Sequence, residues 1–300
     1  MNISFPGLNI GEFTIDPIAI PIGDGGIRWY ALFIVTGMIF AVLYTAYRSK
    51  HEGIVFDTIL DFAIFTIPVG IIGARLYYVF FDWVDIMVNH KVNTYQSFMD
   101  VIAIWNGGLA IYGGVIFGTI TIFVVAKVKK LSAKTLLKIT DAAGPGVMMA
   151  QAIGRWGNFF NQEAHGGAVT NPDWQFFPYA VYIDSPKGAE EVGWYQATFF
   201  YESVWCLIIF GVLLYLFFRQ KYYGQLTLWY LALYGFERGI VEWLRTDQLT
   251  VGGLPVSALL SIVLFVGATT ALIVLKIKKY EHPLPYYKRG EKPEEEKADA

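Results

Sequence analysis

Arginine, glutamate and tyrosine side chains occur inside segments of this chain that are otherwise apolar. One predicted helix face carries Tyr234, Arg238, Glu242 and Arg245. These residues follow one another at spacings of four, four and three, which places them on the same side of a helix. Guanidinium groups bind carboxylates and phosphates in a bidentate fork, so such a face suits an anionic group, for example a phosphodiester. We expect polar residues from neighbouring segments to lie at the same level: Tyr30, Arg75, Tyr112, Arg155 and Glu202.

A second group of polar residues lies between Gly154 and Gly166, in the sequence Gly-Arg-Trp-Gly-Asn-Phe-Phe-Asn-Gln-Glu-Ala-His-Gly. It supplies a cation, two amides and a carboxylate within nine residues, and its glycines allow close helix packing or an unwound turn. Amides that only cap a helix end would explain Asn161, but not the cation and the carboxylate beside it. The polar members of this segment are Arg155, Asn158, Asn161 and Glu163.

The elements that hold these residues are predicted to span a membrane. The chain has 300 residues, of which 55% are apolar and only 16% are charged, against roughly 25% charged in average globular chains. About 20 apolar residues, at 1.5 Å per residue, cross a hydrocarbon core about 30 Å thick. Seven segments fit this length: Trp29–Tyr47, Ile59–Phe80, Gly108–Ala126, Leu136–Phe160, Tyr195–Phe218, Leu226–Leu244 and Leu254–Leu275. We therefore expect an all-α polytopic membrane protein with seven transmembrane helices.

The positive residues predict an orientation, because lysine and arginine are retained on the cytoplasmic side. Of the 23 lysines and arginines, sixteen fall in alternate connections and in the tail: 48–56, 127–138, 219–225 and the residues from 276 onward. This alternation requires residues 136–160 to cross the membrane. The N-terminus is then outside and the C-terminus cytoplasmic, with the polar residues in the outer half of the membrane. The outer segments 81–107 and 161–194 are expected to lie against the outer leaflet.

The same composition predicts one domain without a soluble partner domain. We expect a single seven-helix domain over residues 1–280, a charged and disordered cytoplasmic tail over 281–300, and no cleavable signal peptide. A net charge of −2 gives no basic face for nucleic acid. Cys206 lies inside an apolar segment and is expected to pack as a small apolar side chain. No metal or cofactor site is predicted, since the histidines fall in loops without ligand spacing: His51, His90, His165 and His282.

Two other interpretations of the buried charges remain open. The charges could form a structural ion-pair network, with Arg238 paired to Glu242 or Glu202 and Arg75 paired to Asp82. That explains any single pair, but structural pairs should scatter through the membrane depth, whereas these residues share one half. A transporter or flippase of an anionic solute or lipid would also use buried arginine, although its polar residues should continue through both leaflets.

The segment from Gly154 to Gly166 resembles the signature of the prolipoprotein diacylglyceryl transferases, with glycine, arginine, glycine, asparagine, phenylalanine, asparagine, glutamate and glycine in register. The resemblance extends from about residue 20 to residue 275 and includes the seven-helix topology. Further matching motifs are Arg28-Trp29-Tyr30, Gly73-Ala74-Arg75-Leu76, Trp105-Asn106-Gly107-Gly108 through Gly113-Gly114, Tyr201-Glu202-Ser203 and Tyr234 through Glu242.

The resemblance implies a transferase reaction in the bacterial cytoplasmic membrane, in an active site that faces the outer leaflet. The diacylglyceryl group of phosphatidylglycerol would pass to the lipobox cysteine thiol of a prolipoprotein signal peptide, which forms a thioether and releases glycerol phosphate. The implied partners are phosphatidylglycerol, the prolipoprotein and the surrounding membrane lipids, without a cofactor. The attacking cysteine would belong to the substrate.

The resemblance also implies roles for single residues. Arg155 would bind the phosphate of the lipid and Arg238 would support the leaving phosphate. The headgroup pocket and its surroundings would be formed by Asn158, Asn161, Glu163, Gly166, Tyr30, Arg75, Tyr78, Glu202, Tyr234 and Glu242.

Tyr112 marks a departure from the family pattern. Many members have histidine in this position, just before the paired glycines, where it has been considered a base for the thiol. A phenol holds its proton to about pH 10 and is a poor base at neutral pH, although nearby cations would make it a better one. Alternatively, Tyr112 only orients the substrate, and the proton leaves through water or Glu202.

Overall fold

The computed structural model describes residues 2–5, 10–14, 16–22, 25–89, 98–102, 104, 107–183, 191–244, 250–251 and 254–280. These residues divide into two compact units. The first consists of Met1–Thr45 and Leu137–Ala300, and the second of Ala46–Leu136. Several predictions fall outside the described residues, namely those for His90, Arg245, His282 and the tail 281–300.

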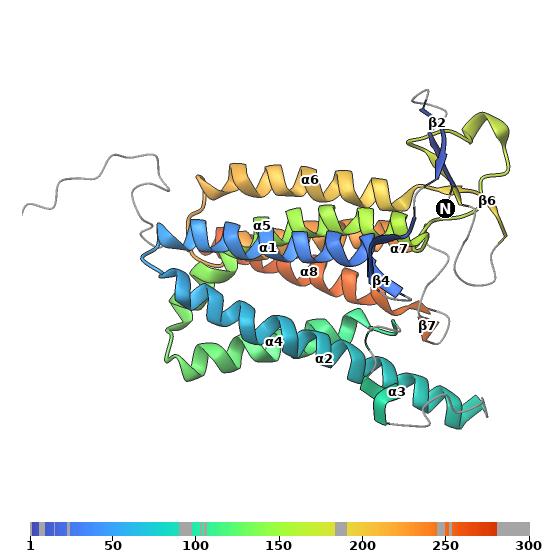
Figure 1. The fold of residues 1–300 in the computed structure, drawn as a ribbon. Coiled ribbons are helices and arrows are strands. Elements are labelled where there is room, and N and C mark those ends of the chain that lie inside the picture. The colour runs from blue at the N-terminus through green and yellow to red at the C-terminus, as the bar shows by residue number, and fades with distance from the viewer. Residues whose placement is uncertain are drawn as a thin grey trace, which may run out of the picture. The chain divides into compact units, whose positions relative to one another are not determined.

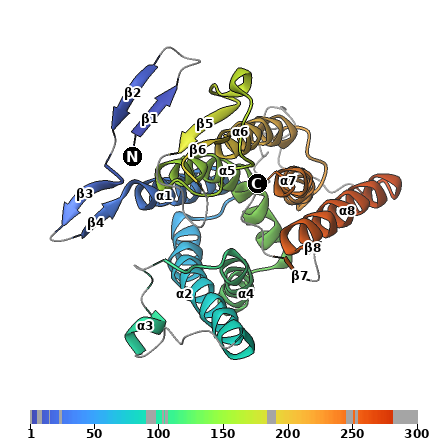
Figure 2. The same cartoon turned by 90° about the vertical axis from the view of Figure 1, so that its right-hand side faces the viewer.

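Five long helices make up most of the first unit (Figure 1): α1 (Trp29–Lys50), α5 (Ala133–Asn161), α6 (Thr198–Phe217), α7 (Gln225–Glu242) and α8 (Val256–Ile277). Figure 2 looks along these helices and shows antiparallel strand pairs beside their ends. The strands are β1 (Asn2–Phe5), β2 (Ile10–Thr14), β3 (Ile18–Ile22), β4 (Gly25–Arg28), β5 (Ala180–Ile183), β6 (Gly193–Gln196), β7 (Thr250–Val251) and β8 (Leu254–Pro255). A single turn of 3₁₀-helix, η3 (Pro172–Trp174), precedes β5.

The second unit contains α2 (Phe56–Asn89), the short α3 (Phe98–Ile102) and α4 (Ile111–Val128). Glycines allow α2 and α4 to touch. A Cβ atom on Gly113 would lie 2.2 Å from the carbonyl oxygen of Gly73, and one on Gly73 would lie 2.4 Å from the ring of Phe117. Any larger residue in these positions would force the two helices apart.

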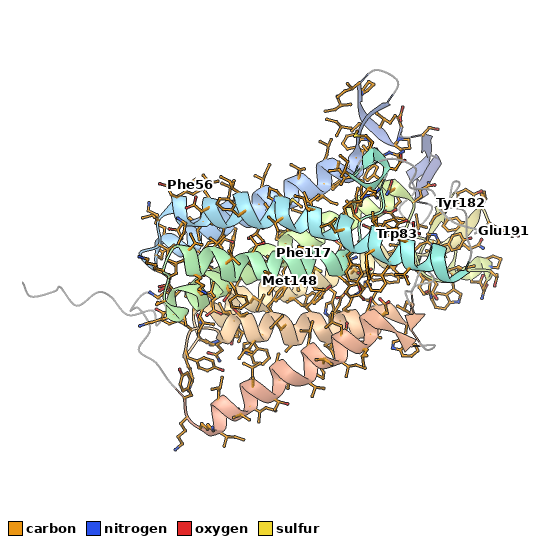
Figure 3. All side chains as sticks on the ribbon, turned by 90° about the horizontal axis from the view of Figure 1, so that it is seen from below. Phe56, Trp83, Phe117, Met148, Tyr182 and Glu191 are labelled. Atoms are coloured by element: carbon orange, nitrogen blue, oxygen red, sulfur yellow. The ribbon has the colours of Figure 1, made fainter. Side chains whose placement is uncertain are left out.

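The prediction of a mostly helical polytopic membrane protein is confirmed. The described residues form seven helices of 18 residues or more, each of which overlaps a predicted span. Five of them are long and apolar enough to cross a membrane: Trp29–Lys50, Phe56–Val84, Ile111–Val128, Thr198–Phe217 and Ser257–Ile277. Large apolar side chains lie on their outer faces, and Figure 3 labels two of them, Phe56 and Trp83, which are 48% and 56% exposed. Such faces suit contact with lipid.

Three predicted spans begin before their helices do, and strands were absent from the prediction. Leu254 and Pro255 form β8, so α8 begins at Val256 and not at Leu254. The third long helix of the structure, α4, begins at Ile111 and not at Gly108, because Gly107 and Gly108 have φ angles of 86° and 68° that no helix contains. Helix α6 begins at Thr198 and not at Tyr195, because residues Gly193–Gln196 pair with β5. The paired strands use the backbone donors that a helix would otherwise need.

The β5–β6 hairpin packs against the adjoining ends of α5 and α6. An apolar cluster of buried side chains holds them together, and it includes Phe159 from α5, Val181 from β5, Tyr195 from β6 and Phe199 from α6. The rings of Phe159 and Phe199 stack with centroids 4.8 Å apart. This cluster fixes the end of the first unit at which Arg155 and Glu202 lie.

Asp141 anchors the opposite end of α5 to the turn between α6 and α7. Its side chain is 1% exposed. Its carboxylate accepts hydrogen bonds from the backbone nitrogens of Gly224 (2.6 Å) and Thr227 (2.8 Å), from the hydroxyl of Thr227 (2.8 Å) and from the amide of Gln220. The carboxylate therefore satisfies orphan donors in the first turn of α7, which sets the start of the helix that carries Arg238.

We expect Gly235→Ala to lower the stability of the first unit, because α7 and α8 approach closely at this glycine. The added methyl group would lie 2.8 Å from the carbonyl oxygen of Ser261 and 2.9 Å from the backbone nitrogen of Phe265. Overpacking of this kind costs about 1–3 kcal/mol. Thermal unfolding in detergent measures the effect. Gly211→Ala is the matched control, since nothing lies within 4 Å of its added methyl group. Equal midpoints for the two variants would contradict the prediction.

Candidate active site

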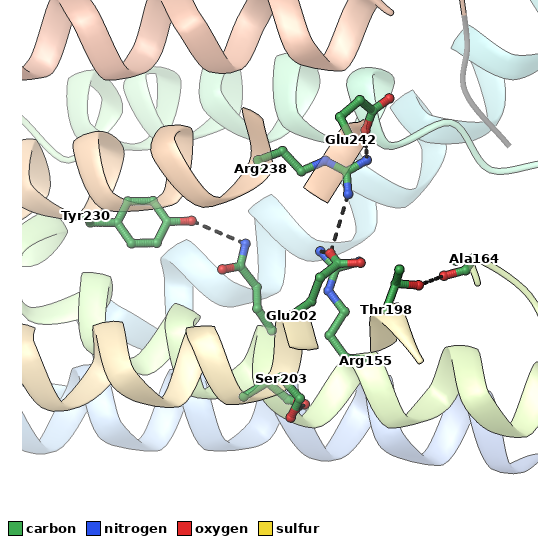
Figure 4. A network of polar contacts seen from close by, with 10 residues as sticks. Arg155, Ala164, Thr198, Glu202, Ser203, Tyr230, Arg238 and Glu242 are labelled. Carbon is green, nitrogen blue, oxygen red and sulfur yellow. Dashed lines mark hydrogen bonds and ion pairs between the residues drawn. The ribbon is translucent and has the colours of Figure 1, made fainter. Parts of the chain in front are cut away.

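Three helices of the first unit bring together four charged side chains, which Figure 4 shows joined by dashed lines. Arg155 on α5 lies with its Nη2 2.7 Å from Oε2 of Glu202 on α6. Arg238 on α7 lies with Nη1 3.4 Å from the same oxygen, and with Nη2 2.7 Å from Oε2 of Glu242 one turn further along α7. We call these four residues the ion-pair network. The sequence left open whether Arg238 pairs with Glu242 or with Glu202; the structure shows Arg238 with both, and Arg155 joins them through Glu202.

The acidic side chains of the ion-pair network are more deeply buried than the basic ones. The side chains of Glu202 and Glu242 are 1% and 2% exposed, whereas those of Arg155 and Arg238 are 17% and 16% exposed. The carboxylates are thus buried and hold the guanidinium groups in place, while the two arginine side chains keep some exposure. What the network offers to a ligand is therefore two fixed cations, a suitable arrangement for an anionic group.

Two predicted tyrosines lie beside the ion-pair network. Tyr30 packs directly against Gly157, because a Cβ atom on this glycine would lie 3.1 Å from the tyrosine ring. The hydroxyl of Tyr30 interacts electrostatically with Arg155 and Glu163. Tyr234 stacks on Tyr230 with ring centroids 5.9 Å apart, and it is an electrostatic neighbour of both arginines of the network. The structure therefore groups Tyr30 and Tyr234 with Arg155.

The segment after α5 is clamped against the start of α6. The backbone nitrogen of Gly166 donates to the carbonyl of Gln196 (3.1 Å), and the hydroxyl of Thr198 donates to the carbonyl of Ala164 (2.7 Å). A Cβ atom on Gly166 would lie 2.8 Å from the side chain of Gln196, so only glycine fits there. These contacts, together with the bond from the nitrogen of Glu163 to the carbonyl of Asn158 (3.1 Å), hold Glu163 beside Tyr30. Asn161 is the last residue of α5.

Sequence reasoning missed a third carboxylate in this group, Glu237. It is 2% exposed, and neither of its side-chain oxygens has a hydrogen-bond partner among the described residues. Its electrostatic neighbours are Glu202, Arg155 and Arg238. The signal was present in the sequence, since Glu237 follows Tyr234 by three residues and therefore lies on the same helix face.

Gln151 and Cys206 complete the surroundings of the ion-pair network. Gln151 precedes Arg155 by one helical turn, and its amide nitrogen lies 3.4 Å from the hydroxyl of Tyr230. Cys206 is 1% exposed and packs among apolar side chains of α5, α6 and α7, as predicted. Within the ranges that the structure describes, no three histidine, cysteine, aspartate or glutamate side chains lie close enough to hold a metal ion.

Three predicted site residues belong to the second unit. Arg75 donates to four backbone carbonyls: Nη2 to Asp100 (2.6 Å), Nε to Val101 (2.8 Å), and Nη1 to Gly107 (2.8 Å) and Gly108 (3.1 Å). These four carbonyls satisfy a guanidinium group for which the sequence had left open a pair with Asp82. Tyr78 lies 5.7 Å from the guanidinium carbon of Arg75, and the ring of Tyr112 lies 6.3 Å from that of Tyr77.

We expect Arg75→Ala to destabilise the connection between α3 and α4, because it leaves four carbonyls without their donor. The free energy of unfolding should fall by about 3 kcal/mol or more, and the amides of 107–110 should lose protection from hydrogen exchange. Lys129→Ala is the control. It removes an ion pair with Asp61 in which both side chains are about a third exposed, and such pairs contribute about 0–1 kcal/mol. Equal losses in the two variants would contradict the prediction.

The family of the chain follows from its similarity to known proteins. Residues 17–274 match the sequence model of the prolipoprotein diacylglyceryl transferases. The chain belongs to this family. Two relatives from Streptococcus pneumoniae, strains Spain 23F-1 and Taiwan19F-14, are each 43% identical over 280 residues, which cover 91% of this chain and 97% of the relative. A relative from strain TIGR4 of the same organism is 42% identical. All three are named phosphatidylglycerol–prolipoprotein diacylglyceryl transferase.

The prediction of this transferase family from the segment between Gly154 and Gly166 is confirmed, and so is the prediction of a transferase. The matched range contains the ion-pair network, Glu237 and the residues of the second unit that the sequence assigned to the site. A diacylglyceryl transferase must hold the group that leaves when the diacylglyceryl unit is transferred. The ion-pair network is the part of the described chain whose fixed, accessible cations suit that task.

Proposed function

We propose that this protein transfers the diacylglyceryl group of phosphatidylglycerol to the lipobox cysteine of a prolipoprotein signal peptide, forms a thioether and releases glycerol phosphate. The observation that carries the proposal is the pair of partly exposed guanidinium groups, Arg155 and Arg238, each fixed by a buried carboxylate. Membership of the transferase family supports this reaction and gives no support to the transporter or flippase alternative.

The reaction depends mainly on stabilisation of the negative charge that develops on the leaving phosphate. The thiol sulfur of the peptide attacks the glyceryl carbon, the carbon–oxygen bond to the phosphate breaks, and the phosphate leaves with the electron pair. Negative charge grows on the phosphate as that bond breaks, so preorganised cations lower the barrier. We assign Arg155 to binding of the lipid phosphate, and Arg238 to stabilisation of the same phosphate as it leaves. The thiol proton must leave as the sulfur attacks, because the thiolate is the nucleophile.

The other predicted residues are proposed to surround the headgroup. Glu202 and Glu242 hold the two arginines, and Tyr30 and Tyr234 lie beside them. Further members of the pocket or its wall in the first unit are Asn158, Asn161, Glu163 and Gly166. For Arg75 and Tyr78, in the second unit, a role at the headgroup stays a prediction from the family resemblance. We propose that the whole of residues 1–280 works as one transferase domain, without a cofactor.

We further propose that all seven long helices cross the bacterial cytoplasmic membrane, with the N-terminus outside and the active site in the outer leaflet. The distribution of lysine and arginine supports this orientation. Helices α5 and α7 are less apolar than the other five long helices, and they carry Arg155, Arg238 and Glu242. A membrane-impermeant thiol reagent on intact cells should label Thr170→Cys and not Lys134→Cys. Cys206 is 1% exposed and gives little background. The reverse labelling pattern would overturn the orientation.

The role proposed for Tyr112 is to orient the substrate, with the thiol proton leaving through water or Glu202. We expect Tyr112→Phe to lower kcat less than about 10-fold, because the ring is kept, and Tyr112→Ala to lower it more. Steady-state turnover of the lipobox peptide measures both variants. A loss in Tyr112→Phe of roughly 10²-fold or more, which is the size of a general-base contribution, would instead make the phenol the base.

A direct assay tests the proposed function. Purified protein in detergent receives phosphatidylglycerol and a peptide that contains a lipobox cysteine. We expect release of glycerol phosphate and a peptide heavier by one diacylglyceryl unit, and neither product when serine replaces the peptide's cysteine. A relative from Streptococcus pneumoniae serves as the positive control. Absence of both products under conditions in which the relative is active would overturn the proposal.

A further inference from the structure

Glu237 is a buried acidic side chain that the proposed reaction has not yet used. It lies on α7, directly before Arg238, and is 2% exposed. Both of its carboxylate oxygens lack a hydrogen-bond partner among the described residues. The arginines of the ion-pair network are its electrostatic neighbours, but the ion pairs join them to Glu202 and Glu242.

Such a side chain is costly, and packing does not explain it. A buried carboxyl group without a partner loses its hydration and gains nothing in return, so an apolar residue of similar size would stabilise the protein more. Buried groups that lack partners within the protein are typical of binding sites, where the ligand supplies the missing hydrogen bonds. Glu237 therefore offers two acceptor oxygens, within a group of residues already suited to a phosphate.

A second open acceptor lies close to the same place. The side-chain oxygen of Gln151 is buried and has no hydrogen-bond partner within the described ranges. Its amide nitrogen lies 3.4 Å from the hydroxyl of Tyr230, and the dashed line that starts at Tyr230 in Figure 4 marks this contact. Tyr230 also interacts electrostatically with Glu237. Glu237, Gln151 and Tyr230 thus belong to one group of polar side chains on α5 and α7, and Glu237 links this group electrostatically to the two arginines. We call these three residues the acceptor layer.

The chemistry of the lipid indicates what the acceptor layer receives. The phosphate of a phospholipid is joined to its headgroup alcohol through one oxygen, so the alcohol lies within a few ångströms of the groups that bind the phosphate. In phosphatidylglycerol this alcohol is a glycerol with two free hydroxyls. Each hydroxyl donates one hydrogen bond, and a carboxylate can accept both.

We propose that Glu237 accepts the hydrogen bonds of the two headgroup hydroxyls of phosphatidylglycerol and thereby selects a glycerol headgroup. The inference rests on the proposed function, because it assumes that the phosphate of this lipid lies on Arg155 and Arg238. Gln151 assists through its open oxygen. Glu237 is in this view a specificity-determining residue that contacts a part of the substrate remote from the breaking bond.

The test compares two lipids that differ only in these hydroxyls, phosphatidylglycerol and phosphatidylpropanol, in the lipobox-peptide assay. Two hydrogen bonds to the carboxyl oxygens are worth enough to give the unchanged protein a preference of roughly 10- to 100-fold in kcat/KM for phosphatidylglycerol. Glu237→Leu should lower kcat/KM for phosphatidylglycerol by about that factor and leave phosphatidylpropanol unchanged, so the preference falls to about one. Glu237→Gln keeps one acceptor oxygen and should show an intermediate preference.

The preference separates this role from others. A structural prop or a proton acceptor for the thiol would affect both lipids equally, so an unchanged preference in Glu237→Leu overturns the inference. Phe236→Leu changes the preceding residue, which is 42% exposed, and is expected to keep the preference. If Glu237→Leu does not fold, Glu237→Gln decides, and an unchanged preference there overturns the inference as well. Equal use of both lipids by the unchanged protein defeats the inference alone, whereas turnover of neither defeats the proposed function.

Discussion

Replacement of Arg155 by lysine is expected to lower kcat/KM for phosphatidylglycerol by roughly 10²- to 10³-fold, the usual cost of removing one fixed donor from a charge-stabilising site. Lysine keeps the positive charge but not the planar fork. Arg155 uses one edge of that fork for Glu202, at 2.7 Å, and its side chain remains 17% exposed for a ligand. An ammonium group is a point charge, so it cannot hold the carboxylate and a phosphate with the same geometry.

Arg155→Ala should abolish measurable turnover, because the cation and its geometry are both lost. Thermal unfolding and steady-state kinetics of the two variants separate activity from folding. Lys129→Ala is the matched control, since it breaks an exposed ion pair of the second unit and is expected to leave turnover unchanged. Full activity in a folded Arg155→Ala variant would remove Arg155 from the site.

The partners inside the ion-pair network show what spacing can and cannot predict. Arg238 and Glu242 are four residues apart, so one helix suffices to bring them together, and the sequence predicts this pair directly. The pair of Arg155 and Glu202 joins α5 to α6 and depends on how these helices pack. No periodicity within one segment contains that information, and the sequence could say only that a buried arginine needs a partner.

The partners of Arg75 could not be predicted from the sequence either. One interpretation left open by the sequence paired this guanidinium group with a carboxylate, but it binds four backbone carbonyls. Two of these belong to Gly107 and Gly108, whose positive φ angles also end the connection before α4. A prediction would have needed the backbone path of this connection, which depends on glycine conformations and not on side-chain type.

The short strands were not predicted because the kinds of residue that they contain also occur in the neighbouring helices. Residues Gly193–Gln196 adjoin an apolar run, and four residues are too few to show an alternation of apolar and polar side chains. Their pairing with Ala180–Ile183 closes a hairpin that packs on Phe159 and Phe199. The long helices were predictable because about 20 apolar residues in sequence allow little else in a membrane.

Replacement of Glu202 by glutamine is expected to lower kcat for the transfer by roughly 10²-fold or more while the KM for phosphatidylglycerol stays the same or falls. Glu202 is buried, and one of its oxygens lies 2.7 Å from Arg155 and 3.4 Å from Arg238. The neutral amide of glutamine takes away the negative charge between Arg155 and Arg238. The two arginines therefore attract an anionic headgroup at least as strongly as before. The guanidinium groups lose the carboxylate that fixes them, and charge stabilisation of the leaving phosphate depends on fixed donors.

The split between kcat and KM distinguishes this positioning role from a general loss of structure. Removing one partner of a buried ion pair costs about 3–5 kcal/mol, so Glu202→Gln should also unfold at a lower temperature. Ser203→Ala is the control in the next position of α6. It removes a hydrogen bond of 3.0 Å to the carbonyl of Ala152 and leaves all charges in place. We expect that variant to lose some stability and to keep kcat within a few-fold. A raised KM with unchanged kcat in Glu202→Gln would mean that Glu202 supports binding of the lipid and not the breaking of its carbon–oxygen bond.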